Sequence, residues 1–480
     1  MTLATRIYDK LPTALQNAAT SARGMQLRRF RYTDYTWQRF EELQRSQWWT
    51  AAELRAYQEE RLRVLVEGAF NDSPHYADKY RSAGLTPADV RTLDDLPKLP
   101  ILRKEELRTE WRRIVPPRLD RRRLWVAYTS GTTGTPLQAF YTPRAFQERI
   151  AFCERAYQWY NPKRFRRRAS FTGKLMVPVD RKPRSLHRTN WAMNQYLFSS
   201  HHLAEEHLPR YLSELARIAP EQIDGILSPI FVVAQHAIRA GRAGWVRPAA
   251  VFPSSETLWA HMRQSLSTAF ACPVANFYGS QEGAPIAYEC PRGGFHMCLE
   301  SGIFEVLRPD GAPCRPGEMG ELVVTAFTSE ATPLIRYAIG DVATLSADGC
   351  ACGRGLPLLA FVHGRVDDMF YTTERGLVPR VDSAFKSIPS CILMTQVAQV
   401  GRDSFEVRIV VDRRDYKPEH GDQLLHNLGD YLGRRVQLQL KFMDRIPTTQ
   451  GGKVKAMVNE CRSREELREI RAAWDQLNAG

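Results

Sequence analysis

The stretch Tyr128-Thr-Ser-Gly-Thr-Thr-Gly-Thr-Pro136 is the part of the chain that decides the fold. Short apolar runs at residues 124–127 and 137–141 flank it and predict a strand on each side. Glycine lets a ligand approach the backbone closely, and Ser and Thr hydroxyls and free N–H groups donate to phosphate oxygens. The loop is therefore a candidate phosphate cradle for a nucleotide, although its composition fits an ordinary hydroxyl-rich hairpin turn equally well.

This loop differs from the Gly-x-x-x-x-Gly-Lys-[Ser/Thr] phosphate loop. No Lys or Arg lies between Arg123 and Arg144, and the loop leads into a strand where the phosphate loop would lead into a helix. If the stretch binds a nucleotide, it does so without a lysine of its own.

Length and charge narrow the class of protein. A chain of 480 residues is too long for one hydrophobic core, so we expect at least two domains. The 67 Lys and Arg outnumber the 53 Asp and Glu, and the net charge of +14 suits anionic ligands. The basic residues are scattered in short clusters such as 121–123 and 163–168, which lack the aromatic pattern of a known nucleic-acid motif, so no nucleic-acid partner is expected.

The chain shows no run near the roughly 18 apolar residues that a membrane-spanning helix needs. Residues 1–31 contain one acid, Asp9, and several basic residues, which leaves open a peripheral contact with a membrane surface. Pro12 and the lack of a cleavage pattern favour a structural arm instead. Nine cysteines without a secretory signal indicate a reducing compartment, so we expect a cytoplasmic protein.

Helical and strand-like segments alternate up to residue 277, which predicts an α/β fold whose sheet has parallel character. Helical spacing is found at residues 37–70, 145–159, 205–218 and 229–240. Strand-like runs are found at residues 169–179, 223–227, 249–252 and 274–277.

From Tyr278 onward the pattern changes to strands and turns, and the charged stretch Gly364-Arg-Val-Asp-Asp368 follows as a linker. The strand-like runs in this β-rich part are residues 302–307, 320–325 and 333–340. Beyond the linker, a small α+β domain is indicated by residues 396–411, 421–432 and 436–442. We predict an N-terminal domain at residues 1–366, with a helical arm and scaffold at 1–95 and a β-rich subdomain at 285–364, and a C-terminal domain at residues 367–480.

Three further stretches carry chemistry. Phe277-Tyr-Gly-Ser-Gln-Glu282 offers an aromatic ring for base stacking beside a carboxylate suited to Mg²⁺. Pro333-Leu-Ile-Arg-Tyr-Ala-Ile-Gly-Asp341 ends a strand and a tight turn with an aspartate that can accept from ribose hydroxyls. Ile446-Pro-Thr-Thr-Gln-Gly-Gly-Lys453 places one lysine in a glycine-rich loop. Taken singly, each fits an ordinary turn or a solvated lysine.

In their order and spacing, however, these motifs resemble the adenylate-forming ligases, the superfamily of acyl-CoA synthetases, luciferases and peptide-synthetase adenylation domains. The match is closer to the phenylacetate-CoA ligase-like branch, which includes capsular polysaccharide biosynthesis proteins. It spans almost the whole chain, including Ser46-Gln-Trp-Trp49, Asn71-Asp-Ser-Pro-His-Tyr76 and residues 96–102. The resemblance implies a large N-terminal domain of mixed sheets and helices with a β-rich subdomain, and a small mobile C-terminal α+β domain.

The resemblance also implies a role for each matching residue. Lys453 would stabilise charge during acyl-adenylate formation, Glu282 would bind Mg²⁺, and Asp367 would be the hinge of the C-terminal domain. Tyr278 would stack on adenine, Asp341 would bind ribose and Arg365 would reach the nucleotide. The other implied nucleotide-binding positions are Thr129, Ser130, Gly131, Thr132, Thr133 and Gly134 at the β- and γ-phosphates, Ser254, Ser255 and Glu256 along the adenine, and Gly279 and Gln281.

Two residues depart from the pattern of the family. Gln281 stands where many relatives have a Thr or Ser hydroxyl for the α-phosphate, and its amide can donate in a different geometry. Thr135 stands where a lysine is often found. We expect catalysis to survive both changes.

Three cysteines and one histidine form a candidate metal site: Cys290, His296, Cys350 and Cys352. A Cys3His set is a closed tetrahedral zinc site, but Cys-x-Cys spacing alone fits unrelated buried thiols as well. The resemblance favours structural zinc that joins two strand hairpins, with Cys298 as a possible substitute ligand. We expect the remaining cysteines to be plain thiols.

The resemblance implies an ATP- and Mg²⁺-dependent ligase that activates a carboxylic acid as acyl-AMP, releases pyrophosphate and passes the acyl group to a thiol, most simply coenzyme A. An amine of an amino acid or a saccharide is the alternative acceptor, and a non-catalytic scaffold is the alternative class. Residues 174–200, which include His187 and Arg188, would wall the acid pocket or form a solvated surface loop. Both a monomer and a homodimer stay open.

Overall fold

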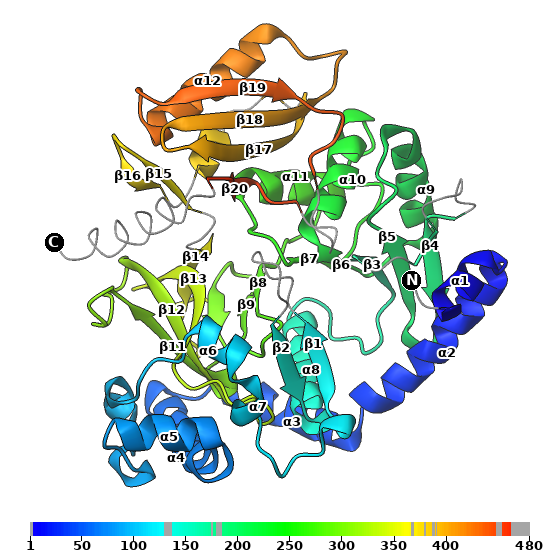
Figure 1. Ribbon diagram of the computed structural model, residues 1–480. Helices are drawn as coiled ribbons and strands as arrows, with labels where there is room; N and C mark the ends of the chain where they lie inside the picture. Colours follow the sequence, from blue (N-terminus) through cyan, green and yellow to red (C-terminus); the bar gives the residue numbers. More distant parts are fainter. Residues whose placement is uncertain are drawn as a thin grey trace. The chain divides into compact units, whose positions relative to one another are not determined.

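The computed structural model describes residues 3–128, 137–173, 176–178, 185–365, 369–378, 381–385, 389, 391–447 and 454–461. Contacts within the chain divide it into two compact units (Figure 1). Unit 1 comprises residues 1–26, 163–276 and 363–480, and unit 2 comprises residues 27–162 and 277–362. The domain boundary at Asp367 stays a prediction, because this residue lies outside the described ranges.

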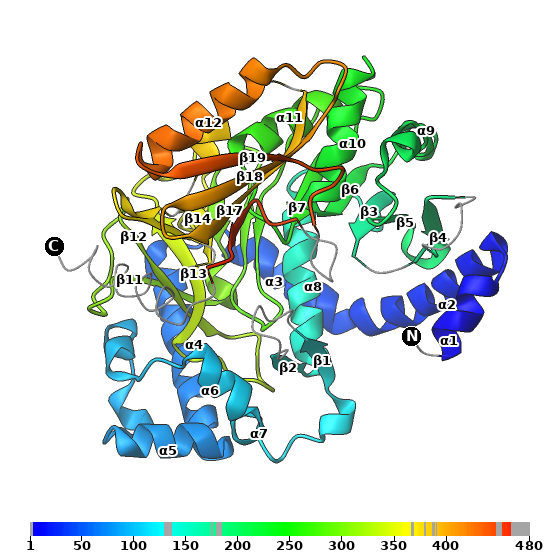
Figure 2. The same ribbon diagram turned by 45° about the horizontal axis from the view of Figure 1, so that its top comes forward.

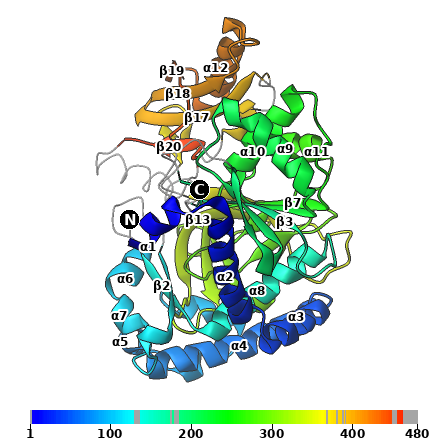
Figure 3. The same ribbon diagram turned by 90° about the vertical axis from the view of Figure 1, so that its right-hand side faces the viewer.

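Unit 1 contains a five-stranded sheet in the order β4-β5-β3-β6-β7, in which β5, β3, β6 and β7 are parallel and β4 is an antiparallel edge. The strands are β3 (Arg168–Thr172), β4 (His187–Asn190), β5 (Gln195–Ser199), β6 (Gln222–Ile226) and β7 (Ala250–Ser254). The helices are α9 (Leu208–Ile218), α10 (Leu227–Arg239) and α11 (Ala260–Phe270), which lie together in Figure 3. The parallel sheet confirms the predicted α/β class, but β3 is shorter than the predicted strand at 169–179.

Residues 274–277 do not form the predicted strand of this sheet. Val274 makes only an isolated parallel bridge to Val251, and the strand β8 (Phe277–Tyr278) pairs with a different sheet, in unit 2. Pro273 donates no backbone hydrogen bond, which limits how far the ladder can extend here.

The N-terminal arm in unit 1 covers the edge strand β4. It consists of α1 (Leu3–Lys10) and the first part of α2 (Thr13–Arg31). The amide of Thr189 donates to Asn17 Oδ1 at 3.0 Å. A Cβ added to Gly24 would lie 2.0 Å from Asn190 Oδ1, so only glycine allows this close approach of helix and strand.

The C-terminal part of unit 1 has a four-stranded sheet in the order β19-β18-β17-β20, with α12 packed along it (Figure 2). Its elements are β17 (Ile392–Gly401), β18 (Ser404–Val411), α12 (Pro418–Leu432), β19 (Gln437–Phe442) and β20 (Met457–Asn459), preceded by the hairpin β15 (Phe370–Thr372) and β16 (Gly376–Val378). The predicted single run at 396–411 is in fact a hairpin that turns between Gly401 and Ser404. Trp259, next to α11, joins the core of this sheet.

Unit 2 begins with helices that scaffold its sheets: α3 (Asp34–Ser46), α4 (Ala51–Asp72), α5 (Pro74–Ser82), α6 (Lys104–Thr109), α7 (Trp111–Ile114) and α8 (Pro143–Gln158). The prediction of one helix over 37–70 is wrong, because the chain breaks at Gln47–Thr50. Thr50 accepts from the amide of Glu53 while Glu53 accepts from the amide of Thr50, and this capping box starts α4 afresh.

The rest of unit 2 is β-rich, as predicted. It contains the hairpin β1 (Trp125–Tyr128) and β2 (Gln138–Tyr141), a three-stranded sheet of β8 with β9 (Ala287–Glu289) and β10 (Phe295–Met297), and a four-stranded sheet of β11 (Gly302–Leu307), β12 (Met319–Ala326), β13 (Tyr337–Leu345) and β14 (Leu359–Arg365). Within the described ranges, short 3-10 turns connect several elements: η1 (Pro87–Asp89), η2 (Leu93–Lys98), η3 (Arg121–Arg123), η4 (Trp191–Met193), η5 (Glu205–His207), η6 (Leu299–Ser301) and η8 (Asp382–Phe385). No helix in the described part of the chain is long and apolar enough to cross a membrane.

Candidate active site and metal cluster

The hairpin β1–β2 of unit 2 flanks the hydroxyl-rich loop in the sequence. Tyr128 and Gln138 are opposite one another at the open end of this hairpin, so residues 129–137 form its connection. The structure confirms the strand on each side. The predicted phosphate contacts of Thr129, Ser130, Gly131, Thr132, Thr133 and Gly134 concern residues outside the described ranges.

The loop after β8 is held by the neighbouring hairpin and helix of the same unit. The Tyr141 hydroxyl, at the end of β2, donates to the carbonyl of Gln281 at 2.6 Å. Arg149 of α8 donates to the carbonyls of Ser280 and Ala284 at 3.2 and 3.0 Å. These bonds leave the Gln281 side chain exposed and fix the backbone on both sides of Glu282.

Glu282 is a buried carboxylate with an unused oxygen. Its side chain is 2% exposed, and among the described residues its Oε1 has no hydrogen-bond partner. A buried carboxylate without a partner is costly, and a hard divalent cation with oxygen ligands would satisfy it. The residue therefore fits the predicted Mg²⁺ role.

Tyr278 and Asp341 lie far apart in the sequence and meet in unit 2. The Tyr278 hydroxyl donates to Asp341 Oδ2 at 2.8 Å, and the tyrosine ring is buried. The predicted strand at 333–340 is displaced: β13 runs through Asp341, and its register against β12 shifts between Glu321 and Val323. Gly340 has φ +84° at this irregularity, a value that glycine adopts readily.

The other predicted nucleotide residues belong to unit 1. Ser254 ends β7 and donates from Oγ to the carbonyl of Gly225 at 3.1 Å. Ser255 has φ +73°, and Glu256 accepts hydrogen bonds from Ser228 of α10. Arg365 is the last residue of β14, a strand that begins in unit 2 and whose last three residues belong to unit 1. Asp367, the predicted hinge, and Lys453, the predicted catalytic lysine, lie outside the described ranges.

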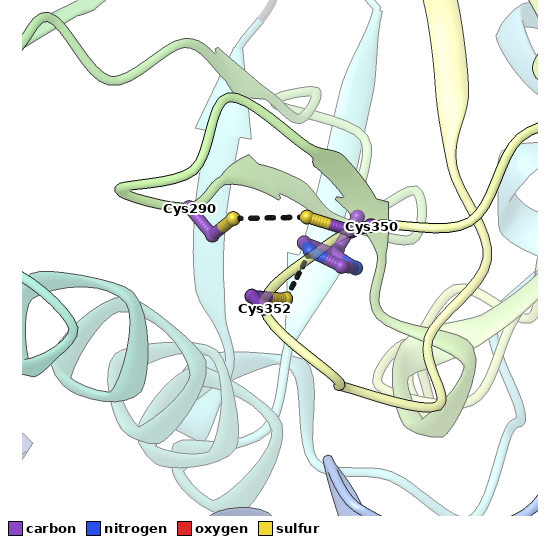
Figure 4. A group of neighbouring side chains, drawn as sticks. Cys290, Cys350 and Cys352 are labelled. Atoms are coloured by element: carbon purple, nitrogen blue, oxygen red, sulfur yellow. Dashed lines mark hydrogen bonds between the residues drawn. The ribbon is translucent and has the colours of Figure 1, made fainter.

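The four predicted metal ligands come together in unit 2 (Figure 4). One ligand atom from each of Cys290, His296, Cys350 and Cys352 lies within 4.8 Å of every other. Cys290 Sγ lies 3.5 Å from Cys350 Sγ, and Cys352 Sγ lies 3.3 Å from His296 Nε2. Three thiols and one imidazole around a common centre are the donor set of a closed zinc site.

Backbone contacts position the side chains of this cluster. The carbonyl of Leu356 lies 2.9 Å from His296 Nδ1, which leaves Nε2 facing the thiols. A Cβ added to Gly294 would lie 2.5 Å from Cys350 Sγ, so glycine is needed where the two hairpins approach. Burial raises the pKa of Cys290 to about 11. Burial also lowers the pKa of His296, and this lower pKa favours the neutral imidazole that a metal needs.

The segment Ser46-Gln-Trp-Trp49 supports the cluster, a role that the sequence did not reveal. Gln47 Oε1 accepts from Trp159 Nε1 and from Arg354 Nε, each at 2.9 Å. The carbonyl of Gln47 accepts from the amide of Gly355 at 3.0 Å. The break between α3 and α4 is therefore bonded to the loop that carries Cys350 and Cys352.

Cys298, the proposed substitute ligand, is not in the cluster of described metal-ligating side chains. It is fully buried, and burial raises its pKa to about 12. Residues 174–175 and 179–184 of the basic segment lie outside the described ranges, so its place at the acid pocket stays a prediction. Arg188 is 4% exposed and donates from Nε to Gln16 Oε1 of the arm at 2.6 Å, and His187 pairs with Glu214 at 2.7 Å. These two residues are therefore not part of a solvated loop.

Solved structures share the fold of this chain. It is the fold of the adenylate-forming CoA ligases: a crystal structure of 2-hydroxyisobutyryl-CoA ligase in the postadenylation state, in complex with 2-HIB-AMP, matches with a TM-score of 0.70 and 18% sequence identity, over 89% of this chain and 93% of that chain. A second structure of that ligase, in complex with R3-HIB-AMP, matches with a TM-score of 0.69 and 17% identity, over 89% of this chain and 94% of that chain.

Among individual proteins, the chain is similar to protein CapK of Staphylococcus aureus, with 26% identity over 94% of this chain and 98% of CapK. It is also similar to the phenylacetate-coenzyme A ligase of Thermus thermophilus, with 27% identity over 85% of this chain and 96% of that protein. Residues 370–460 match the family described as the CapK C-terminal domain. These similarities confirm the resemblance found in the sequence, both to the superfamily and to the phenylacetate-CoA ligase-like branch.

Proposed function

We propose that this protein is an ATP-dependent ligase that activates a carboxylic acid as an acyl-adenylate and transfers the acyl group to coenzyme A. The observation that carries the proposal is the meeting of Tyr278 and Asp341, with the buried Glu282 four residues beyond the tyrosine. These are the positions that the resemblance assigns to adenine, ribose and Mg²⁺. The relatives and the solved neighbours support the same reaction.

The geometry supports a division of labour in the first half-reaction. Tyr278 offers its ring to the base, and the carboxylate of Asp341, which accepts from the Tyr278 hydroxyl, is the acceptor for ribose hydroxyls. An acid oxygen then attacks the α-phosphorus, the bond to the β-phosphate oxygen breaks, and pyrophosphate leaves. Lys453 stabilises the charge that builds up on these oxygens. Glu282 would hold Mg²⁺, which supplies further electrostatic stabilisation to the phosphates.

In the second half-reaction the thiol of coenzyme A attacks the acyl carbon of the adenylate, and AMP leaves. An amine of an amino acid or a saccharide is the second candidate acceptor, with a role in capsular polysaccharide biosynthesis. The observation that favours it is the similarity to CapK, which extends over more of this chain than the similarity to the Thermus thermophilus ligase.

A pyrophosphate exchange assay tests the proposal. We expect ATP-dependent exchange with at least one acid from a panel that includes phenylacetate and 2-hydroxyisobutyrate. Lys453→Ala should lower the exchange rate about a hundredfold or more, because one positioned charge contributes several kcal/mol at the transition state. Product analysis with coenzyme A against amine acceptors then separates the two candidates. No exchange with any acid would instead favour a non-catalytic scaffold.

We propose that Cys290, His296, Cys350 and Cys352 hold a structural zinc ion. Metal analysis of the purified protein should find about one zinc per chain, because this donor set closes a tetrahedral site. Cys350→Ser should lose the metal and unfold at a lower temperature, whereas Cys314→Ser, at a buried thiol outside the cluster, should keep it. Equal and negligible zinc in the wild type and in both variants would disprove the site.

We also propose that the protein acts in the cytoplasm. All nine cysteines lie within the described ranges, and none of them is in a disulfide bond there. Free thiols are typical of a reducing compartment.

A further inference from the structure

Glu256 lies in the short connection between β7 and α11, at the carboxyl edge of the unit 1 sheet. The parallel strands β6 and β7 finish side by side, with Ile226 opposite Ser254. From β6 the chain passes directly into α10, and from β7 it passes through Ser255 at φ +73°. This left-handed conformation is unfavourable for a residue other than glycine, and it turns the next side chain, that of Glu256, toward α10.

The Glu256 carboxylate is bonded in two directions. Its Oε2 accepts from the amide of Ser228 at 2.7 Å, and its Oε1 accepts from the Ser228 hydroxyl at 2.9 Å. Ser228 lies in the first turn of α10, where a negative charge interacts favourably with the helix dipole. The carboxylate is therefore held firmly from the side of the sheet.

The Glu256 carboxylate also accepts a hydrogen bond from the C-terminal part of unit 1. Glu256 Oε1 also accepts from the backbone amide of Val454 at 2.7 Å, across 198 positions of sequence. Val454 immediately follows Lys453 in the chain. Hydrogen bonds from a backbone amide to a carboxylate are among the stronger ones in proteins, because one partner is charged.

The residues after Val454 are fixed as well. The carbonyl of Lys455 accepts from Gln396 Nε2, and the carbonyl of Ala456 accepts from the amide of Val397, each at 2.8 Å. The parallel pairing of β20 with β17 follows directly. Among these contacts of residues 454–456, only the bond to Glu256 comes from outside the C-terminal segment.

We propose that Glu256 is a positioning residue for the first half-reaction, because it anchors Val454, the residue that follows Lys453 in the sequence. This inference rests on the proposed function for its chemistry. The resemblance places the backbone of Ser254, Ser255 and Glu256 along the adenine, and the positioning role concerns the side chain of Glu256. In the second half-reaction Lys453 is not needed, so the anchor contributes nothing there.

Hydrogen exchange tests the contact without relying on activity. In the wild type, the Val454 amide should exchange slowly. Glu256→Ala should speed its exchange about tenfold or more, because the amide loses a charge-assisted bond. Ser228→Ala should leave it protected, since that change removes only the hydroxyl's bond to Glu256 Oε1 and keeps both the bond from the Ser228 amide and the bond from the Val454 amide. An amide that exchanges equally fast in the wild type and in Glu256→Ala would overturn the proposal.

Separate half-reactions test the role. With phenylacetate, Glu256→Ala should lower the rate of pyrophosphate exchange about ten- to a hundredfold, because a misplaced catalytic group loses that much rate. Coenzyme A transfer from supplied phenylacetyl-adenylate should stay within about twofold of wild type. Glu256→Gln, which keeps one acceptor oxygen, should recover part of the lost exchange.

The outcomes of these experiments distinguish the positioning role of Glu256 from the proposed ligase function. Equal losses in both half-reactions, together with a lower melting temperature, would show a merely structural carboxylate and overturn the positioning role. A wild type that is inactive with every acid, yet has a protected Val454 amide, would overturn the proposed function and uphold the contact. Selective loss of adenylation supports both.

Discussion

We expect Glu282→Gln to lower the rate of acyl-adenylate formation by about two to three orders of magnitude, since a divalent cation held by this carboxylate would stabilise the transition state by several kcal/mol. The reason lies in the buried carboxylate, whose Oε1 has no hydrogen-bond partner within the described residues. Glutamine keeps the shape of the side chain but removes the charge that attracts Mg²⁺. The measurement is pyrophosphate exchange at increasing Mg²⁺ concentrations, and the variant should need more Mg²⁺ for half-maximal rate.

The matched control is Glu321→Gln, which changes a glutamate of the same unit that pairs with Arg103 at the surface. This variant should retain wild-type exchange, because exposed ion pairs contribute little. If Glu282→Gln shows the same Mg²⁺ dependence as the wild type, the residue is not a metal ligand and its burial needs another explanation.

Breaking the buried ion pair of Arg155 and Glu300 should destabilise unit 2 by about 3 to 5 kcal/mol. The two side chains are 0% and 1% exposed, and Arg155 lies 2.6 Å from Glu300 Oε1. Ser46 and the carbonyl of Leu43 complete the network, which connects α3, α8 and the turn before β11. Glu300→Gln or Arg155→Met leaves one buried charge without its partner. Calorimetry should show a lower melting temperature, and proteolysis should cleave faster between α3 and α8.

The double variant Arg155→Met with Glu300→Leu separates charge from packing. Replacing both charges by apolar side chains of similar volume leaves no unpaired charge, so it should be more stable than either single variant. A double variant that is as unstable as the sum of the two single variants would mean that the hydrogen bonds to Ser46 and Leu43, and not the ion pair, hold this region together.

The sequence predicted the periodic elements well and their interruptions poorly. Residues 145–159 and 229–240 show regular helical spacing and are helices, because apolar periodicity reflects the face that each helix buries. The break at residues 47–50 was not predicted, because Trp48 and Trp49 continue the apolar pattern. Only the pair Thr50 and Glu53 marks a new helix start. A local capping box overrode the longer pattern.

The candidate site was predicted from short sequence motifs and not from the periodicity of apolar residues. The pair Tyr278 and Asp341, and the four metal-ligating side chains, follow from the order of motifs along the chain, and the structure brings each group together. The contact between Glu256 and Val454 could not be predicted, because it depends on how two segments of unit 1 pack. The same is true of Arg188, whose exposed-looking charge is buried by the N-terminal arm.

The contact of Gln47 with Arg354 and Gly355 has a consequence for how unit 2 assembles. Unit 2 is discontinuous, because residues 163–276 interrupt it. Gln47 comes before the interruption and the cysteine loop after it, so the two meet only when the second portion has been synthesised. Cys290, His296, Cys350 and Cys352 all belong to the second portion, so a bound metal would fix the loop that Gln47 contacts and would stabilise the joint between the two portions only through that loop.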